Sequence, residues 1–546
     1  MSTGRVKDPE LNMAAVHFLE FINRDVSALN GPIDYSKHGI NCCDSKAIDT
    51  RCNPIEVPDD DPYLKVTNIR CLNFSRAETF QDIGCTPQIK HPEQINYQTP
   101  TIDLSTVYGV NEKALSTVRE FKNGLLREEK IAIPTNNNTE DICIQYRDNE
   151  TICYKFGYPE IAKFDIRTTT FSLFFTREHN RLARALHKIN PCWKDDRLFK
   201  VARMINIATA AHMFMYELLP EIMGYRNMIN HGLISKYVEH VTTYDEDAVP
   251  LVYAEYELAM KFFHTLWDGR IKKYDKNLHF VGELSISDTL FRPDLIKNNT
   301  DFKNINRGTF FQNAGRIDDI IDPEISENFY GRIEKAHDVL AADIQRGRDL
   351  RVPGYNKYRK MCGMTTAKKF EDFLDAMNIE KMEALKALYD DVDDVDLFAG
   401  IVTENFVQEA HVGPTLYCIM AKQIQIFRFA DRFWFERGDQ FHSFSLSQLH
   451  EIRKSNMARF ACDNADIEFI QPRAFHIPGP GHQNVPVACI QIPGPNLNAW
   501  RDNSCQKAVL KTNHTSSDTK TIYVQQPYAT NHYVSIYNTL FSYKPN

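Results

Sequence analysis

Two long helical patterns, separated by a short break, most constrain the fold of this chain. The first runs over residues 168–189 and ends before Asn190-Pro191, a pair that favours a turn. The second covers residues 196–223, repeats its apolar residues at helical spacing, and stops at Gly224. Convincing alternating patterns for strands are few and short elsewhere. We therefore predict a mainly α fold, a large helical single domain with few short strands.

The same periodicity predicts further helices over residues 10–30, 252–267, 328–350, 366–391 and 415–432. The domain is expected to span residues 1–505, followed by a polar, tyrosine-rich tail over residues 506–546. No apolar stretch reaches the length needed to span a bilayer. The formal net charge of -8 gives no reason to expect nucleic acid as a partner.

Thirteen cysteines, several of them closely spaced, indicate disulfides and an oxidising compartment. The short spacings are Cys42-Cys43 with Cys52, Cys143 with Cys153, and Cys462 with Cys489. N-x-S/T sequons, which agree with a secreted glycoprotein, start at Asn73, Asn137, Asn149, Asn298 and Asn513. Met1 is followed by no apolar signal segment, so we expect a secreted protein whose N-terminal part is missing from this sequence.

Several ordered blocks carry a resemblance to a known family. They are Thr99-Pro-Thr-Ile-Asp-Leu-Ser-Thr-Val-Tyr-Gly109, Arg177-Glu-His-Asn-Arg-Leu-Ala183, Asp343-Ile-Gln-Arg-Gly-Arg-Asp349, Pro353-Gly-Tyr-Asn356 and Asp431-Arg-Phe-Trp-Phe-Glu436. Between about Asp8 and Trp500 the chain resembles the animal haem peroxidases of the peroxidase–cyclooxygenase superfamily, of the secreted invertebrate type. The resemblance implies haem, calcium and oxidation of small donors by hydrogen peroxide.

The resemblance also implies disulfide pairings. They are Cys42–Cys52, Cys43–Cys71, Cys143–Cys153, Cys362–Cys418 and Cys462–Cys489. It leaves Cys85, Cys192 and Cys505 unassigned.

His264, in Met260-Lys-Phe-Phe-His-Thr-Leu266, aligns with the proximal histidine that ligates haem iron in the family. Taken alone, a histidine on an apolar helix face is more often a core residue. A metal-bound imidazole needs a partner for its other ring nitrogen, and the resemblance implies Asp394 for this role, unless Asp394 belongs to a solvated acidic turn. Lys261 stands where the family has an arginine beside a haem propionate, and it keeps the charge without the bidentate fork.

Thr99, Thr101, Asp103 and Ser105 alternate along the chain, so in an extended segment their side chains would share one face. Hydroxyl, carboxylate and carbonyl oxygens suit Ca²⁺, although spacing alone favours an ordinary polar strand. The resemblance implies a calcium site made by these residues, including the Thr101 carbonyl, and by Asp25. Calcium would then clamp the distal helix to the core.

The distal helix departs from the family pattern Gln-x-x-Asp-His-Asp, because this chain reads Glu20-Phe-Ile-Asn-Arg-Asp25. Arg24 stands where the distal histidine belongs, and Asn23 replaces the aspartate that esterifies haem. Peroxidase chemistry needs a distal group that takes up and returns a proton, and an arginine does not deprotonate in proteins. Losing such a group costs about 10²–10⁴ in rate.

A second catalytic element of the family is also missing. Its arginine falls on Glu160 or Ile161 and its haem-linking glutamate on Lys163 or Phe164, depending on a one-residue shift. We therefore expect haem b without ester links.

Two main hypotheses follow. In the first, Glu20 acts as the distal base with Arg24 supplying positive charge, so that H₂O₂-dependent oxidation is weak or altered. In the second, a Glu20–Arg24 ion pair fills a disused pocket, and the chain is an inactive scaffold for adhesion, matrix or haem binding with an extracellular matrix or cell-surface partner. A third possibility is that haem is lost altogether. Arg437-Gly-Asp439 has the form of an integrin-type tripeptide, which short sequences produce by chance.

Overall fold

The computed structural model describes residues 6–29, 42–43, 51–64, 68–80, 93–127, 142–145, 151–154, 166–242, 244–290, 295, 299–318, 320–329, 337–479, 481 and 483–505. Predictions on Cys85, on residues 155–165, on the sequons other than Asn73 and on the tail from residue 506 lie outside them. The described part of the chain is mainly helical with few short strands, as predicted.

The α-helices are α1 (Met13–Val26), α3 (Ser105–Tyr108), α4 (Glu112–Val118), α5 (Ile166–Ile189), α6 (Asp195–Met213), α7 (Leu219–Met223), α8 (Tyr225–Asn230), α9 (Ala254–Ala259), α10 (Asn299–Phe311), α11 (Pro323–Ser326), α12 (Val339–Asp349), α13 (Tyr355–Met361), α14 (Ile379–Leu388), α15 (Leu397–Thr403), α16 (Pro414–Phe429), α17 (Leu446–Ile452) and α18 (Met457–Asn464). The π-helix η3 covers Phe214–Leu218. The 3₁₀ helices are η4 (Met260–Leu266), η5 (Ile286–Asp288), η8 (Phe370–Asp375), η10 (Cys489–Gln491) and η11 (Leu497–Trp500).

The strands form antiparallel pairs. They are β1 (Lys7–Asn12) with β8 (Asn313–Gly315), β2 (Ile55–Glu56) with β3 (Cys71–Leu72), β4 (Ile142–Gln145) with β5 (Thr151–Tyr154), β6 (Arg270–Tyr274) with β7 (Phe280–Ser285), and β9 (Phe469–Ile470) with β10 (Val487–Ala488). Among the helices in the described part of the chain, none combines the length and apolar character needed to cross a lipid bilayer.

Most predicted helices are present with shifted ends. Residues 168–189 become α5, and residues 196–223 become the continuous run of α6, η3 and α7. The predicted helix over 366–391 is instead split into η8 and α14, with Asn378 capping the start of α14 through its side chain. The helix predicted over 10–30 is shorter, because residues 7–12 form β1 before α1 begins.

Asn12 fixes the start of α1 from both ends of its side chain. Its Oδ1 accepts hydrogen bonds from the backbone N–H groups of Ala14 and Ala15, at 3.1 and 3.3 Å. Its Nδ2 donates to the carbonyls of Phe310 and Ala474, at 2.8 and 2.7 Å. The cap satisfies two helix N–H groups and anchors the helix to two distant segments of the core.

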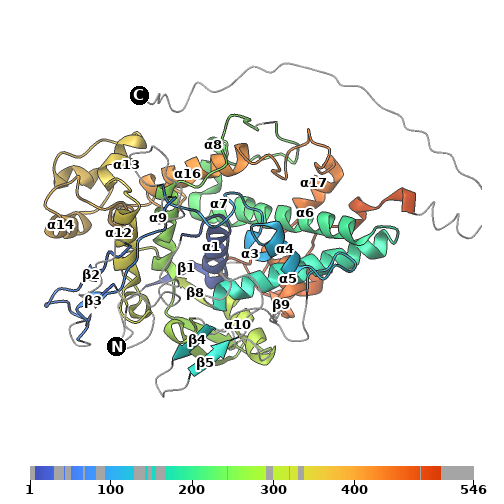
Figure 1. Cartoon of the computed structure of the whole chain (residues 1–546), viewed down its shortest axis with the longest axis horizontal. Coiled ribbons are helices and arrows are strands. Elements are labelled where there is room, and N and C mark those ends of the chain that lie inside the picture. Colours follow the sequence, from blue (N-terminus) through green and yellow to red (C-terminus); the bar gives the residue numbers. More distant parts are fainter. Residues whose placement is uncertain are drawn as a thin grey trace, which may run out of the picture. The chain divides into compact units, whose positions relative to one another are not determined.

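Helix α1 lies in the core, and every one of its residues except Arg24 is buried. Figure 1 shows α5 as a long helix beside it, and α5 in turn packs against α6. Phe18 packs against Phe171 of α5 with ring centroids 5.6 Å apart, and Phe21 stacks on Phe175 at 5.1 Å. These aromatic contacts hold α1 against α5 in a fixed orientation.

Four predicted disulfides are confirmed. They are Cys42–Cys52, Cys43–Cys71, Cys362–Cys418 and Cys462–Cys489. Cys192 and Cys505, which the sequence left unassigned, are also disulfide-bonded. Cys143 and Cys153 are backbone partners in the β4–β5 ladder, and their side chains lie outside the described part of the structure.

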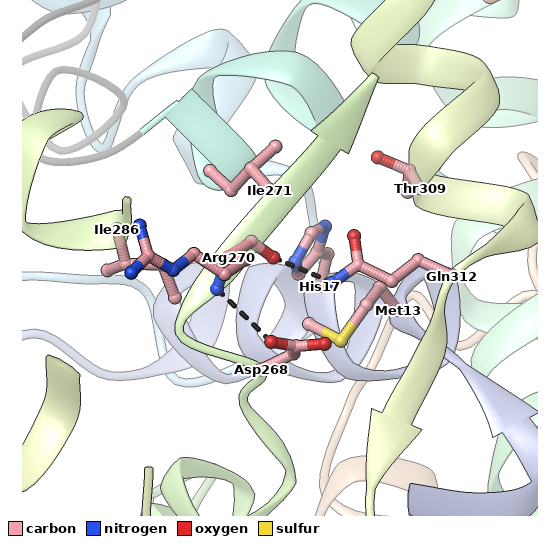
Figure 2. Close-up of a pocket in the computed structure, with 8 residues that line it drawn as sticks. All are labelled: Met13, His17, Asp268, Arg270, Ile271, Ile286, Thr309 and Gln312. Carbon is pink, nitrogen blue, oxygen red and sulfur yellow. Dashed lines mark hydrogen bonds between the residues drawn. The ribbon is translucent and has the colours of Figure 1, made fainter. Parts of the chain in front are cut away.

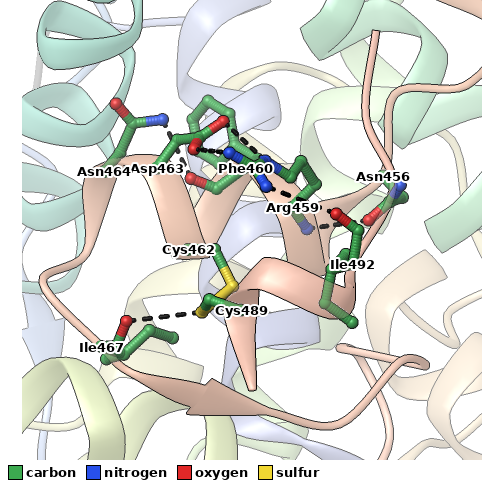
Figure 3. Close-up of a disulfide and its surroundings, with 9 residues drawn as sticks. All are labelled: Asn456, Arg459, Phe460, Cys462, Asp463, Asn464, Ile467, Cys489 and Ile492. Atoms are coloured by element: carbon green, nitrogen blue, oxygen red, sulfur yellow. Dashed lines mark hydrogen bonds and ion pairs between the residues drawn. A yellow bond between two sulfur atoms is a disulfide. The ribbon is translucent and has the colours of Figure 1, made fainter. Parts of the chain in front are cut away.

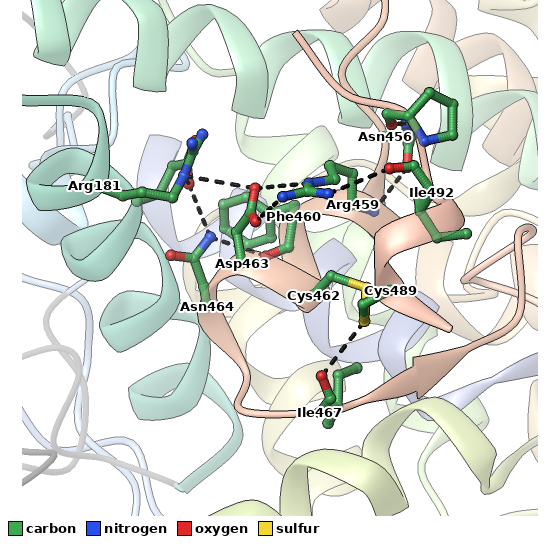
Figure 4. Close-up of polar contacts among 12 residues, drawn as sticks. Arg181, Asn456, Arg459, Phe460, Cys462, Asp463, Asn464, Ile467, Cys489 and Ile492 are labelled. Carbon is green, nitrogen blue, oxygen red and sulfur yellow. Dashed lines mark hydrogen bonds and ion pairs between the residues drawn. A yellow bond between two sulfur atoms is a disulfide. The ribbon is translucent and has the colours of Figure 1, made fainter. Parts of the chain in front are cut away.

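The Cys462–Cys489 disulfide joins α18 to η10 (Figure 3). Beside it, Arg459 pairs with Asp463 one helical turn further along α18. Arg181 of α5 lies 3.6 Å from the same carboxylate, so a covalent and an ionic contact together hold this helix in place (Figure 4).

His179 of α5 joins three segments through its ring. Its Nε2 lies 2.8 Å from the Gly124 carbonyl, which only accepts, so Nε2 carries the proton and Nδ1 accepts from Tyr108 Oη at 2.8 Å. The side-chain amide of Asn206 in α6 donates to the same hydroxyl at 3.0 Å. Burial lowers the pKa of His179 to about 4.

This lowered pKa predicts acid sensitivity. The unfolded chain takes up a proton on His179 near its ordinary pKa of about 6.5, and the folded chain does not until about pH 4. The contribution of His179 to stability is therefore complete above pH 6.5 and is lost as the pH falls toward 4, by at most about 1.4 kcal/mol per pH unit. We expect His179→Gln to reduce the slope of unfolding free energy against pH in this window. His279→Gln, at an exposed histidine, is the matched control, and equal slopes in wild type and His179→Gln would contradict the prediction.

Candidate functional site

The proximal position is built by η4 and α12. His264 is buried in η4, and its Nδ1 lies 2.6 Å from Oδ2 of Asp343 in α12. A carboxylate on one ring nitrogen fixes the orientation of an imidazole and leaves the other nitrogen as the ligand atom. This pair has the chemistry of an axial ligand to a metal.

The partner of His264 is therefore Asp343, and the expectation for Asp394 is corrected. Asp394 is exposed in the turn between α14 and α15, and its backbone N–H donates to the carbonyl of Asp391. Asp343 reaches His264 because α12 packs against α9, the helix that continues into η4. One sequence feature could have pointed to Asp343 as the partner of His264. Asp343 begins one of the blocks that carry the family resemblance.

Glu257 of α9 engages two residues that were expected at the haem edge. Lys261 Nζ lies 2.7 Å from Glu257 Oε1, one turn away on the same helical run. Asn23 Nδ2 of α1 donates to Glu257 Oε2 at 3.4 Å. Lys261 thus has a carboxylate partner within the protein, and Asn23 links α1 directly to the proximal helix.

On the distal side, Glu20 faces two guanidinium groups. Its Oε1 accepts from Nε and an Nη of Arg24, at 3.1 and 3.0 Å. Its Oε2 lies 3.8 Å from an Nη of Arg167, in the first turn of α5. Glu20 and Arg167 are both buried, whereas Arg24 is a quarter exposed. Sequence analysis did not identify Arg167, because its approach to Glu20 depends on the packing of α5 against α1.

Trp267, a second unforeseen residue, connects this cluster to His264. The guanidinium carbon of Arg167 lies 3.7 Å from the centroid of the Trp267 ring. That ring lies 4.4 Å, centroid to centroid, from the imidazole of His264. Trp267 is fully buried. Side chains in contact therefore run from the distal helix to the proximal histidine.

These residues fit haem on one side only. The His264–Asp343 pair suits an axial ligand to iron. A planar porphyrin would have to separate Glu20 and Arg24 from His264, yet Arg167 and Trp267 already join them through contacts below 4.5 Å. As they are arranged here, the distal residues do not fit the group. Lys261, which the resemblance places beside a haem propionate, pairs with Glu257 in the protein alone.

The predicted calcium ligands gather where α1 ends and α3 begins. Asp25 Oδ1 accepts from the backbone N–H and hydroxyl of Thr106, at 3.0 and 2.9 Å. Ser105 Oγ donates to the Asp25 carbonyl at 2.8 Å. Asp103 Oδ1 accepts from the hydroxyl of Thr99 at 2.7 Å, and Thr101 lies between these two in the same loop. The loop therefore brings Asp103 and Ser105 close to Asp25, with Thr99 bonded to Asp103.

This loop is not the extended segment that alternation suggested. Residues 100–103 are bends, and Leu104 is left-handed with φ of 57°. A left-handed leucine is strained, and here its N–H donates to Asp25 Oδ2 at 2.8 Å. The strained residue turns the backbone toward the carboxylate.

Electrostatics at this loop favour a cation. Burial, and secondly the charge of Asp103, raise the pKa of Asp25 to about 7. Loss of water contact also raises the pKa of Asp103. Two carboxylates that repel one another in a buried site are stabilised by a divalent cation, and hydroxyl, carboxylate and carbonyl oxygens are the ligands that Ca²⁺ prefers. The residues present therefore fit calcium.

Two other features play no part in these sites. The guanidinium of Arg437 pairs with Asp439 of its own tripeptide, at 3.0 and 2.6 Å, and lies over the Tyr244 ring, so this arginine is buried rather than presented. A hollow at the start of α1 is lined by Met13, His17, Asp268, Arg270, Ile271, Ile286, Thr309 and Gln312 (Figure 2). None of these residues belongs to the haem or calcium positions.

Comparison with known proteins agrees with the resemblance. A family model described as animal haem peroxidase matches residues 1–475. A Drosophila melanogaster peroxidase is 34% identical over 520 residues, which cover 92% of this chain and 75% of that protein. A Drosophila melanogaster chorion peroxidase is 29% identical over 516 residues, covering 90% of this chain and 62% of the relative.

The fold is similar to solved structures as well. Peroxidase A from Dictyostelium discoideum superposes with a TM-score of 0.69 at 22% identity, over 86% of this chain and 88% of the other. The Oryza sativa fatty acid alpha-dioxygenase gives a TM-score of 0.60 at 17% identity, over 79% of this chain and 70% of the other. The extent of the family match and the identity to the Drosophila peroxidase together decide the assignment. The chain belongs to the animal haem peroxidase family.

Proposed function

We propose that this protein does not cleave peroxide by the route of its family and serves as a secreted, calcium-stabilised scaffold on the peroxidase fold. The carrying observation is the position of Glu20, whose two oxygens face Arg24 and Arg167. Peroxide cleavage needs a distal group free to take a proton from H₂O₂ and return it to the leaving oxygen. Arg24 does not deprotonate, and Glu20 accepts two hydrogen bonds from Arg24 and lies at ion-pair distance from Arg167.

Calcium has a structural role in this proposal. Asp25, Thr99, Thr101, Asp103 and Ser105 would hold Ca²⁺ between the end of α1 and the start of α3. The ion would offset the repulsion between the two carboxylates and fix α1 against the loop. It would take no part in oxidation.

An extracellular setting supports a role in an extracellular matrix or at a cell surface. Disulfides such as Cys362–Cys418 and Cys462–Cys489 form and persist in oxidising compartments. Two of the relatives have names that place them in the chorion. The partner would be a protein of such a layer, and hydrogen peroxide and small donors would be poor substrates.

Turnover of a phenolic donor by H₂O₂ tests the proposal on the full chain after incubation with hemin and calcium. We expect a rate about 10²–10⁴ below that of the Drosophila peroxidase measured alongside, because the positioned acid–base group is missing. A comparable rate would overturn the proposal.

The retained His264–Asp343 pair favours a second candidate, a weak peroxidase in which Glu20 is the distal base. One variant, Glu20→Gln, distinguishes the two candidate functions. Any residual turnover would fall sharply in Glu20→Gln if Glu20 moves the proton, and would stay unchanged if it does not. Arg473→Gln changes an exposed arginine remote from Glu20 in the sequence. It is the control for a loss of turnover that comes from the preparation and not from the substituted residue.

A further inference from the structure

We infer that Arg167 and Trp267 occupy the position of haem in this protein and keep the cofactor out. The inference builds on the proposed function, which concerns only the distal acid–base group. It adds that the cofactor itself is kept out. Arg167 and Trp267 carry the argument because neither was expected at the site and both are buried there.

The contacts form one continuous series across the haem position. Glu20 meets Arg167 at 3.8 Å, the Arg167 guanidinium lies 3.7 Å from the Trp267 ring centroid, and Trp267 lies 4.4 Å from the His264 ring. A haem bound to His264 with Glu20 on its other face would have to break this series. Both side chains would then need new positions in a core that is closely packed.

Charge explains why the series holds together. A buried cation needs a partner, and Arg167 has a carboxylate on one side and the electron-rich face of an indole on the other. Moving Trp267 away to admit a porphyrin would remove one of these two contacts. Arg24 shares the same carboxylate, which keeps Glu20 directed toward the arginines.

A second connection crosses between the same elements. Asn23 of α1 donates to Glu257 of α9, and Glu257 also pairs with Lys261 of η4. Helix α1 packs directly against η4 as well. Haem entry would therefore have to separate α1 from the proximal helix at two places. Side chains of the protein already join the two elements at both places.

Titration of the full, calcium-loaded chain with hemin tests the inference. We expect no saturable Soret band that depends on His264, and no shift of the melting temperature with hemin. Uptake of one haem per chain, with a band that disappears in His264→Ala, would overturn the inference. If that haem-loaded protein showed no peroxide turnover, the proposed function would still stand, so the two failures are distinguishable.

A double variant tests the two side chains directly. Arg167→Ala with Trp267→Val is expected to bind hemin at least tenfold more tightly than the parent, with a Soret band that a further His264→Ala change removes. Arg197→Ala with Trp193→Val removes a similar stack, at 4.2 Å, between other residues and should leave hemin binding unchanged. A folded double variant with no gain, or an equal gain in the control, would overturn the inference. Should the double variant not fold, Trp267→Val alone replaces it, with the same readings.

Discussion

Glu20→Ala is expected to lower the unfolding free energy of the chain by about 3–5 kcal/mol. Glu20 is fully buried, and it is the carboxylate that both Arg24 and Arg167 face. Removing one member of a buried ion pair leaves the opposite charge with less compensation in a poorly polarisable environment. The loss should appear as a lower midpoint in chemical denaturation with an unchanged slope.

The chain offers a matched control for this result. Asp196 and Lys200 in α6 have the same i, i+4 spacing and lie 2.7 Å apart, but both are well exposed. Asp196→Ala should therefore cost no more than about 1 kcal/mol. If both variants lost a similar amount of unfolding free energy, burial of the Glu20 ion pair would not be the cause of the loss.

A third variant separates charge from packing. Replacing Glu20 and Arg24 together by methionine removes both members of the closer pair while keeping similar volume. Replacing a buried pair by apolar residues is often neutral or stabilising, so this variant should recover part of the loss. No recovery would indicate that Arg167 is the partner that matters.

The helical part of the fold was predictable because it depends on local periodicity. The patterns over 168–189 and 415–432 correspond to α5 and α16 within two or three residues at each end. The disulfides followed from family resemblance and were confirmed wherever both side chains are described. The start of α1 was misplaced, since the residues before it form β1 through pairing with β8, a strand far away in the sequence.

The candidate site was harder to predict because its contacts are between distant segments. His264 was named from its motif, but its partner Asp343 is 79 residues away and was passed over for Asp394. Arg167 has no motif, and its role appears only once α5 packs against α1 and brings it beside Glu20. The Glu20–Arg24 pair was foreseen because helical spacing alone determines it.

Removing calcium is the second change with a large expected effect. At a free calcium concentration a hundredfold above the dissociation constant, the ion should stabilise the chain by about 2.7 kcal/mol. Chelation should remove this amount, because Asp25 and Asp103 are then left to repel one another near the core. Thermal unfolding with and without a chelator measures the difference.

Asp25→Asn decides whether that difference arises at the proposed site. The substitution removes one of the two repelling charges, and the amide oxygen remains able to accept from Thr106. The amide nitrogen would, however, face the Leu104 N–H that donates to Oδ2 in the wild type, so the reading is the calcium response of the variant and not its melting temperature alone. We expect the variant to gain little from added calcium. Asp391→Asn, in the exposed acidic turn between α14 and α15, should keep the full calcium response. The proposed site would be wrong if Asp391→Asn lost the calcium response and Asp25→Asn kept it. Calcium would then bind away from α1, and it would not be the ion that holds the distal helix to the loop at Leu104.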